Sequence, residues 1–346
     1  MKRSTFTASL GFAALSVPAF ARTAFADEVV TVGTSRSSSD VPFFIGEKMG
    51  FFAAEGITLK LEPFDSAARM VAPLGAGQLD VAAGAPSAGL YNAVAQGIEI
   101  RIVADKGSSP KGYGYAPLLV RADLVKSGKV KSFKDLKGLK VAEPAQGTST
   151  AAELNEVLKR TGVSYADINH IYLGFPLHVA AFESGSIDAS ITTEPSATLA
   201  VRSGAAVRFA SDDVFYPGQQ VAVVLYGGNF IAKRREVGVK FMIAYIKSVR
   251  FYNDALKDGH LTGKNGPAVL DILTEYTPVK DRKIYEEATP QGNDPDGRVN
   301  VTSLKNDLAF YRSLGLVTGN ATVEGVHDSS FVDAAIKQIG SYRKRK

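Results

Sequence analysis

The stretch from Val29 to Phe64 constrains the fold of this chain most strongly, because it alternates between strand and helix patterns. Val29 to Val32 is a short β-branched apolar run, which is typical of a buried strand. A polar loop, Thr34 to Asp40, follows it, Pro42 begins a helical pattern, and Ile57 to Leu61 has the pattern of a second strand. This order predicts a βαβ unit, in which ligands bind beyond the carboxyl ends of the strands, near a helix N-terminus.

Two similar segments indicate that one structural plan occurs twice in the chain. Residues 77–88 and 185–197 both run glycine, one residue, an aliphatic residue, aspartate, a short stretch of mostly small residues and Pro-Ser-Ala. Because 346 residues exceed what one hydrophobic core usually holds, the similarity predicts two lobes built on the same plan.

Two short apolar runs outside the second copy are the expected connections between the lobes. Tyr115 to Val120 and Val221 to Tyr226 are both flanked by glycines, which can absorb a hinge rotation. We therefore expect lobe I to comprise residues 27–114 and 227–346, and lobe II to comprise residues 115–226 with both crossing strands. The expected fold class is α/β, with two lobes joined by two crossing hinge strands.

The N-terminus has the features of a secretory signal. A basic start precedes an apolar stretch, Ala8 to Phe20, and Ala24-Phe25-Ala26 matches an A-x-A cleavage pattern. We expect residues 1–26 to be a signal peptide that is cleaved near Ala26, and the mature protein to be soluble and periplasmic. A cut after Ala21 is the alternative, and the apolar run is too short for a membrane anchor, which needs roughly 18 to 20 residues.

Composition excludes several classes of partner and chemistry. The chain has no Cys, so we expect no disulfide, no thiol nucleophile and no lipidated Cys. Removal of the signal takes away Lys2, Arg3 and Arg22 and lowers the formal net charge from +5 to +2. A net charge this small does not indicate a protein that binds nucleic acid, so we expect no nucleic-acid partner. The sequence has no Gly-x-Ser-x-Gly motif, no His pair at metal spacing and no phosphate-binding glycine motif. We therefore expect no enzyme activity, no metal and no cofactor.

Polar loops at the ends of predicted strands are the candidate ligand site. Small hydroxyl residues recur in three of these loops, at or near a helix start: Ser35 to Ser39 and Ser87 in the expected lobe I, and Thr148 to Thr150 in the expected lobe II. Hydroxyls, unpaired helix N–H groups and a guanidinium suit a sulfonate, a carboxylate or a similar oxyanion. The residues expected to bind the ligand are Ser35, Arg36, Ser37, Pro42, Phe43, Ser87, Gln146, Thr148, Ser149, His178, Glu194 and Tyr216.

Several of these residues also have a structural alternative. Ser and Thr are ordinary helix N-caps, so any single hydroxyl can serve the fold alone. Arg36 can be a solvated loop charge, and Glu194 can cap a helix or brace its lobe. His178 can equally be a core or surface histidine.

Four parts of the chain carry a family resemblance. They are VPFF at residues 41–44 with GFFAAEGI at 50–57, GQLDVA at 77–82, FKDLKGLKVA at 133–142, and AAFESGSIDA at 180–189 running into Glu194-Pro195. In their order and spacing they resemble the nitrate, sulfonate and taurine group of periplasmic substrate-binding proteins, which serve ABC importers and share a fold with thiamine-precursor binders.

The resemblance implies the type II periplasmic binding protein fold, which closes on a small molecule held between two lobes. It also implies delivery of that molecule to the permease of an ABC transporter, and we expect the protein to be a monomer. Thr193 stands where the family often has an aromatic residue, which argues against taurine-like selectivity. By position, the residues that match the cleft lining of the family are Ser35, Ser37, Ser87, Thr148, Ser149 and Glu194.

The function expected from the sequence is the capture of a small anionic organic ligand, of the sulfonate or carboxylate class, for an ABC permease. One alternative is a ligand-sensing periplasmic protein that feeds a receptor kinase, and another is a binding protein for a thiamine-precursor pyrimidine. An enzyme acting in the cleft is the third, but the enzyme branch of the superfamily uses a cysteine-rich motif that this chain lacks.

Overall fold

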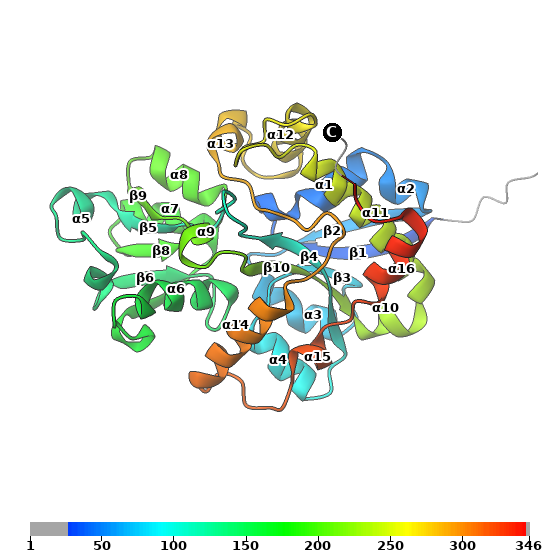
Figure 1. Cartoon of the computed structure of the whole chain (residues 1–346), viewed down its shortest axis with the longest axis horizontal. Coiled ribbons are helices and arrows are strands. Elements are labelled where there is room, and N and C mark those ends of the chain that lie inside the picture. The colour runs from blue at the N-terminus through cyan, green and yellow to red at the C-terminus, as the bar shows by residue number, and fades with distance from the viewer. Residues whose placement is uncertain (1–26, 344–346) are drawn as a thin grey trace, which may run out of the picture.

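The computed structural model describes residues 27–343, and the expected signal peptide at residues 1–26 lies outside the described residues. The described chain forms two α/β lobes that lie side by side, each built around a five-stranded sheet (Figure 1). The predicted α/β fold class is therefore confirmed. No helix within residues 27–343 is long and apolar enough to cross a bilayer.

The two sheets follow the same plan. The first contains β1 (Glu28–Thr34), β2 (Ile57–Pro63), β3 (Val81–Gly84), β4 (Ile100–Ser108) and β10 (Gln220–Gly227), and the second contains β5 (Leu118–Arg121), β6 (Lys140–Glu143), β7 (Asn169–Tyr172), β8 (Ala189–Ile191) and β9 (Ala206–Ala210). The strand orders are β2-β1-β3-β10-β4 and β7-β6-β8-β5-β9. In each sheet one strand, β1 or β6, has parallel neighbours on both sides, and antiparallel pairing of β10 or β5 completes the other half.

Helices pack around both sheets (Figure 1). The second lobe has α5 (Ala122–Lys126), α6 (Ser149–Lys159), α7 (Phe175–Glu183), α8 (Ser196–Arg202) and α9 (Asp212–Phe215). The remaining helices are α1 (Val41–Lys48), α2 (Phe51–Ala54), α3 (Val71–Gly75), α4 (Ala88–Ala95), α10 (Gly228–Lys233), α11 (Arg235–Asn253), α12 (Gly266–Tyr276), α13 (Arg282–Glu287), α14 (Val301–Ser313), α15 (Val323–Val326) and α16 (Ser330–Ile339), and the 3₁₀ turns are η1 (Ser38–Asp40), η2 (Ala67–Met70), η3 (Phe133–Leu136) and η4 (Tyr165–Asp167).

The longest helix, α11, shows how apolar spacing builds the first core. Met242, Ile246 and Val249 recur three or four residues apart, so they share one face of the helix. All three are buried, and the helix packs against α1 and α16. Complete burial of such a side chain stabilises the fold by roughly 1.5–3 kcal/mol.

The helical pattern that begins at Pro42 is interrupted at Gly50, the glycine expected to break the chain, which adopts a left-handed conformation with φ of 70° between α1 and α2. The structure differs from the sequence-based expectation at two strands. The strands β4 and β9 were not predicted. Arg101 interrupts the apolar run of β4, and Arg208 interrupts that of β9. The sequence pattern therefore does not reveal these strands, which are defined by the pairing of β4 with β10 and of β9 with β5.

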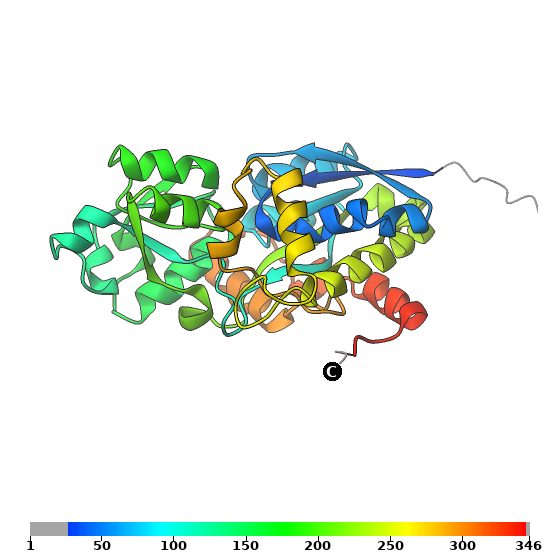
Figure 2. The same ribbon diagram turned by 90° about the horizontal axis from the view of Figure 1, so that it is seen from above.

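The chain passes between the lobes at two segments, residues 109–117 and residues 216–219 (Figure 2). These segments contact each other, since the Gly218 N–H donates to the Ser109 carbonyl oxygen over 2.7 Å. The two apolar runs that were expected to cross, Tyr115 to Val120 and Val221 to Tyr226, lie at or next to these segments. The first run leads into β5 of the second sheet, which begins at Leu118, and the second run belongs to β10 of the first sheet. The lobe boundaries at residues 114/115 and 226/227 stay a prediction.

Helix α14 makes a further connection between the lobes, near the crossing segments. Its Phe310 packs edge-on against Tyr165 of the second lobe, with ring centroids 5.2 Å apart. Its Asp307 accepts hydrogen bonds from the Tyr216 hydroxyl at 2.7 Å and from the Gln219 side-chain amide at 3.3 Å. In Figure 1, α14 (orange) accordingly lies below the sheets and reaches toward α6.

Three buried carboxyl groups gather where these elements meet. Burial raises the pKa of Asp212 and of Asp307 to about 7, although Asp212 accepts a hydrogen bond from Ser109. Burial also raises the pKa of Glu153 well above its ordinary value, and the neighbouring Asp212 and Asp307 add to this shift. Neither carboxyl oxygen of Glu153 has a hydrogen-bond partner among the described residues. These acids therefore retain protons at pH values where exposed carboxyl groups have lost them.

The free energy of unfolding is expected to fall as the pH rises from about 4 to about 7. Within this window the folded protein holds protons that the unfolded chain has released, so each added pH unit favours unfolding. Asp307→Asn should remove one such group and reduce the slope by roughly 1.4 kcal/mol per pH unit. Urea unfolding at a series of pH values measures this slope.

Asp333→Asn is the matched control, because Asp333 is exposed on α16. We expect this variant to keep the slope of the wild-type protein. Equal slopes in all three proteins would show that Asp307 does not hold its proton in the folded state.

Candidate functional site

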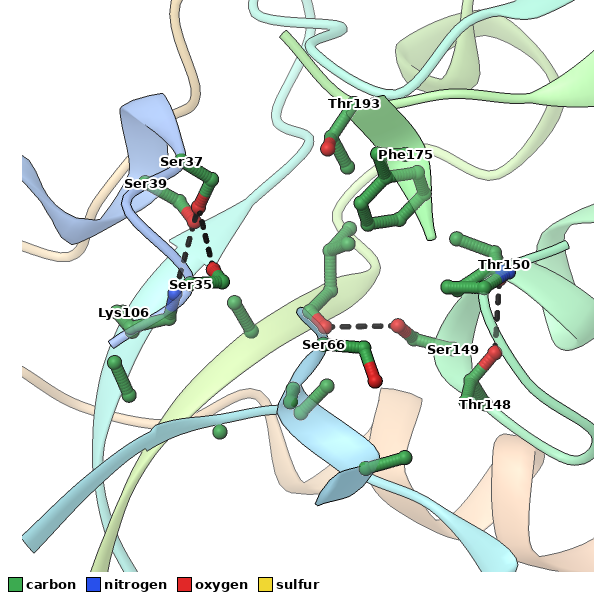
Figure 3. A pocket seen from close by; sticks show the side chains of 18 of the residues that line it. Ser35, Ser37, Ser39, Ser66, Lys106, Thr148, Ser149, Thr150, Phe175 and Thr193 are labelled. Atoms are coloured by element: carbon green, nitrogen blue, oxygen red, sulfur yellow. Dashed lines mark hydrogen bonds between the residues drawn. The ribbon is translucent and has the colours of Figure 1, made fainter. Parts of the chain in front are cut away.

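A cavity lies between the two lobes, with polar residues on opposite sides of it (Figure 3). The first lobe contributes the loop after β1 and the end of β4, whereas the second contributes the start of α6 and the loops before α7 and α8. Its lining comprises Ser35, Ser37, Ser39, Ser66, Ala67, Ala68, Ala83, Gly84, Ala85, Lys106, Tyr115, Pro144, Thr148, Ser149, Thr150, Phe175, Thr193, Val221 and Ala222.

A second hollow adjoins this cavity, and we refer to it as the outer hollow. The two share Ser35, Ser37, Phe175 and Thr193. The outer hollow adds Arg36, Asp65, Pro176, Glu194, Pro195, Ser196, Leu199, Pro278 and Val279. Arg36 is exposed and has a positive φ of 52°, an uncommon conformation for a residue with a Cβ atom.

The loop after β1 places three serine hydroxyls at the cavity. The turn η1 follows the loop directly, and its Asp40 accepts from the Ser37 backbone N–H at 3.3 Å, as in a helix capping box. Ser35 donates to Ser37 at 3.1 Å, and Ser37 shares a hydrogen bond with Ser39 at 3.0 Å. The loop is therefore held by its own hydrogen bonds.

Lys106, at the end of β4, is the charged residue that lines the cavity. Its ammonium donates to Asp40 Oδ1 at 2.6 Å and to Ser39 Oγ at 2.9 Å. The pair is buried, with 3% of the Lys106 side chain and none of the Asp40 side chain exposed. Sequence reasoning missed Lys106 because it missed β4, in which Lys106 follows the apolar run Ile102 to Ala104 after one intervening residue, Asp105.

Across the cavity, the N-terminus of α6 presents Thr148, Ser149 and Thr150. Thr148 and Thr150 share a hydrogen bond of 2.9 Å, and Ser149 donates to the Val221 carbonyl oxygen of β10 at 2.8 Å. The first N–H groups of a helix have no intrahelical acceptor, and the dipole of α6 adds partial positive charge at this end. This side of the cavity therefore suits an oxyanion.

The structure brings half of the sequence-predicted site residues to the two hollows. Ser35, Ser37, Thr148 and Ser149 line the cavity, and Arg36 and Glu194 line the outer hollow. The remaining six line neither: Pro42, Phe43, Ser87, Gln146, His178 and Tyr216. Ligand contact by any of the twelve stays a prediction.

Four of these six lie beside the site. Pro42 and Phe43 are buried in α1, within the core of the first lobe. Ser87 is the N-cap of α4, where its hydroxyl accepts from the Leu90 N–H at 3.2 Å. Gln146 is exposed, two residues before Thr148.

The other two are held by hydrogen bonds in the protein. His178 is buried, with its ring nitrogens 2.8 Å from Thr192 Oγ1 and 2.9 Å from the Leu173 carbonyl oxygen. Burial lowers the pKa of His178 to about 4, so its ring is neutral at pH 7. Tyr216 is the residue that donates to Asp307 of α14.

Glu194 has structural partners for both carboxylate oxygens. Oε1 accepts from the Arg208 guanidinium of β9, and Oε2 accepts from the Thr198 N–H of α8 at 2.9 Å. Its carbonyl oxygen accepts from the Ser38 hydroxyl of the first lobe at 2.9 Å. Glu194 thus braces its own lobe through the side chain and contacts the other lobe through the backbone.

The two α/β lobes with a polar cavity between them form the periplasmic binding protein fold. The chain belongs to the NMT1-like family, whose model matches residues 24–259. No curated protein matches the chain in sequence. Among the described residues, no three His, Asp or Glu side chains are grouped so that they could hold a metal ion.

Three solved structures show the same fold. The ligand-binding component of an ABC-type import system from Staphylococcus aureus, with zinc bound, is 15% identical with a TM-score of 0.73, and 89% of this chain and 99% of that chain are covered. The alkanesulfonate-binding protein SsuA from Xanthomonas axonopodis pv. citri, bound to MOPS, is 15% identical with a TM-score of 0.67 and coverages of 87% and 98%. The periplasmic nitrate-binding protein NrtA from Synechocystis PCC 6803 is 14% identical with a TM-score of 0.74 and coverages of 90% and 89%. A desulfurization enzyme also has this fold, so the fold alone does not distinguish binding from catalysis.

Arg208→Ala is expected to destabilise the protein by about 3 kcal/mol, because it leaves the buried Glu194 carboxylate without its cation. Arg202→Ala is the matched control, since the exposed Arg202 pairs with Asp281 and Glu287 at the surface, and its loss should cost less than about 1 kcal/mol. Urea unfolding of both variants measures the difference. Equal losses in the two variants would contradict the bracing role of Glu194.

Proposed function

We propose that this protein is an extracytoplasmic solute-binding protein that captures a small organic anion, of the sulfonate or carboxylate class, and delivers it to an ABC permease. The observation that carries the proposal is the cavity between the lobes, where the buried Lys106 ammonium and the N-terminus of α6 lie on opposite sides. The expected signal peptide at residues 1–26 supports a periplasmic location, and we propose that the protein acts as a monomer.

The lining supports an organic anion rather than a bare inorganic one. Hydroxyls, an ammonium and helix N–H groups can donate hydrogen bonds to an oxyanion. Between these groups lie apolar surfaces, among them Pro144, Phe175 and Val221, which suit the body of an organic ligand. The alkanesulfonate-binding and nitrate-binding proteins with the same fold support the anionic class.

The arrangement also supports a binding mechanism in which the lobes close on the ligand. A ligand that contacts both lobes stabilises the arrangement in which they are close, and a permease can recognise that arrangement. Among the described residues that line the cavity there is no His, Asp or Glu, and the Lys106 ammonium is held in an ion pair with Asp40 at 2.6 Å, which favours its charged form over a free amine that could act as a base. We therefore propose binding without turnover.

The ligand class is tested by thermal unfolding with nitrate, ethanesulfonate, benzenesulfonate, butyrate and benzoate, and with glucose and choline as controls. At about a hundred times its dissociation constant, a ligand adds roughly 2.7 kcal/mol, which raises the Tm by several degrees. We expect at least one organic anion to raise the Tm and both controls to leave it unchanged. A shift with glucose or choline alone would refute the anionic class.

Ser37→Ala is expected to weaken the binding of that anion about fivefold, since a hydrogen bond of a hydroxyl contributes on the order of 1 kcal/mol. Ser132→Ala is the matched control, because Ser132 and Asp135 form the same capping box as Ser37 and Asp40, at the 3₁₀ turn η3 of the second lobe. Isothermal titration calorimetry compares both variants with the wild-type protein. The same affinity in all three would reduce Ser37 to a helix cap.

A further inference from the structure

The cavity has one charged lining residue and one counterion behind it. Lys106 lines the cavity, and Asp40, which lines neither hollow, contacts the same ammonium at 2.6 Å. Both side chains are almost completely withdrawn from solvent. Because the effective dielectric constant is low in such a place, the Asp40 charge acts on a ligand in the cavity as well as on Lys106.

The hydrogen bonds of this pair leave Lys106 one N–H group for a ligand. An ammonium has three N–H groups, and Asp40 and Ser39 accept two of them. The third has no acceptor among the described residues. Asp40 in turn accepts from the Ser35 hydroxyl at 3.2 Å and from the Ser37 N–H at 3.3 Å through its other oxygen. Asp40 thus orients both the ammonium and the serine loop.

The formal charges of the site cancel. Lys106 is balanced by Asp40, and in the outer hollow Arg36 is balanced by Asp65, while Glu194 pairs with Arg208. What remains at the cavity are the N-termini of α6 and α7, each of which corresponds to roughly half a positive charge. A ligand with one negative charge leaves only a small imbalance, whereas a second negative charge would be buried without a partner.

We propose that Asp40 is the residue that sets the charge of the ligand. By neutralising Lys106, it restricts the cavity to ligands whose head group carries a single negative charge and excludes dianions. This inference rests on the proposed function, because it specifies which anions the same cavity accepts.

The test compares two probes of similar shape and different charge, benzenesulfonate and phenyl phosphate. Benzenesulfonate carries one negative charge at all pH values used, and phenyl phosphate passes from one to two charges as its second proton dissociates near pH 6. By calorimetry at pH 8, the wild-type protein should bind benzenesulfonate at least tenfold more tightly than phenyl phosphate. Asp40→Asn leaves Lys106 uncompensated, so it should strengthen phenyl phosphate binding at least tenfold.

Asp135→Asn is the matched control for Asp40→Asn. Asp135 occupies the equivalent position in the capping box of η3, and it lines neither hollow. Its substitution changes the net charge of the protein by the same amount and should leave the affinities for both probes unchanged. An Asp40→Asn variant with native circular dichroism and no gain in phenyl phosphate binding overturns the proposal.

A second measurement needs no variant, and it decides the question if Asp40→Asn does not fold. Between pH 5 and pH 8 the affinity of the wild-type protein for phenyl phosphate should fall at least tenfold relative to its affinity for benzenesulfonate. Benzenesulfonate serves as the reference, because burial raises the pKa of Asp105, Asp212 and Asp307 to about 7 and their charges also change in this range. The same ratio of the two affinities at both pH values, or equal binding of both probes at pH 8, overturns the proposal. A different result would overturn the proposed function itself: the wild-type protein would then bind none of the organic anions in the thermal-unfolding panel.

Discussion

The arrangement of the candidate site depends on the buried ion pair between Lys106 and Asp40. In the first sheet, β1 and β4 are separated by β3 and β10, so the loop after β1 and the end of β4 are not neighbours in the strand order. The ammonium joins these two segments, and the carboxylate then holds Ser35 and Ser37. A buried charge is tolerated only when it is paired and hydrogen-bonded, so each member of the pair requires the other.

The second lobe is connected to this unit through backbone atoms and through buried acids. Ser38 donates to the Glu194 carbonyl oxygen, and Ser149 donates to the Val221 carbonyl oxygen, so each lobe offers a hydroxyl to the other. Asp307 of α14 accepts hydrogen bonds from Tyr216 and Gln219, which belong to the second crossing segment, residues 216–219. Contacts between the lobes therefore lie both at the cavity and at the segments that cross between the lobes.

Part of the cavity lining could be predicted from the sequence, because strand ends and helix starts are local patterns. Ser35, Ser37, Thr148 and Ser149 line the cavity as expected, since each belongs to a loop that follows a parallel strand. Lys106 could not be found in this way, because β4 becomes a strand only through its pairing with β10, a segment distant along the chain.

The sequence by itself determined the α/β class, the repeated plan of the lobes and the hydroxyl-rich loops, because these follow from periodicity and from residue type. Only the tertiary structure decided which polar groups have partners within the protein and which face the cavity. Glu194 is occupied by Arg208 and Thr198, whereas Lys106 keeps one N–H group without an acceptor among the described residues. The physical reason is that a polar group is satisfied by whatever lies within hydrogen-bond distance in space, irrespective of its separation along the chain.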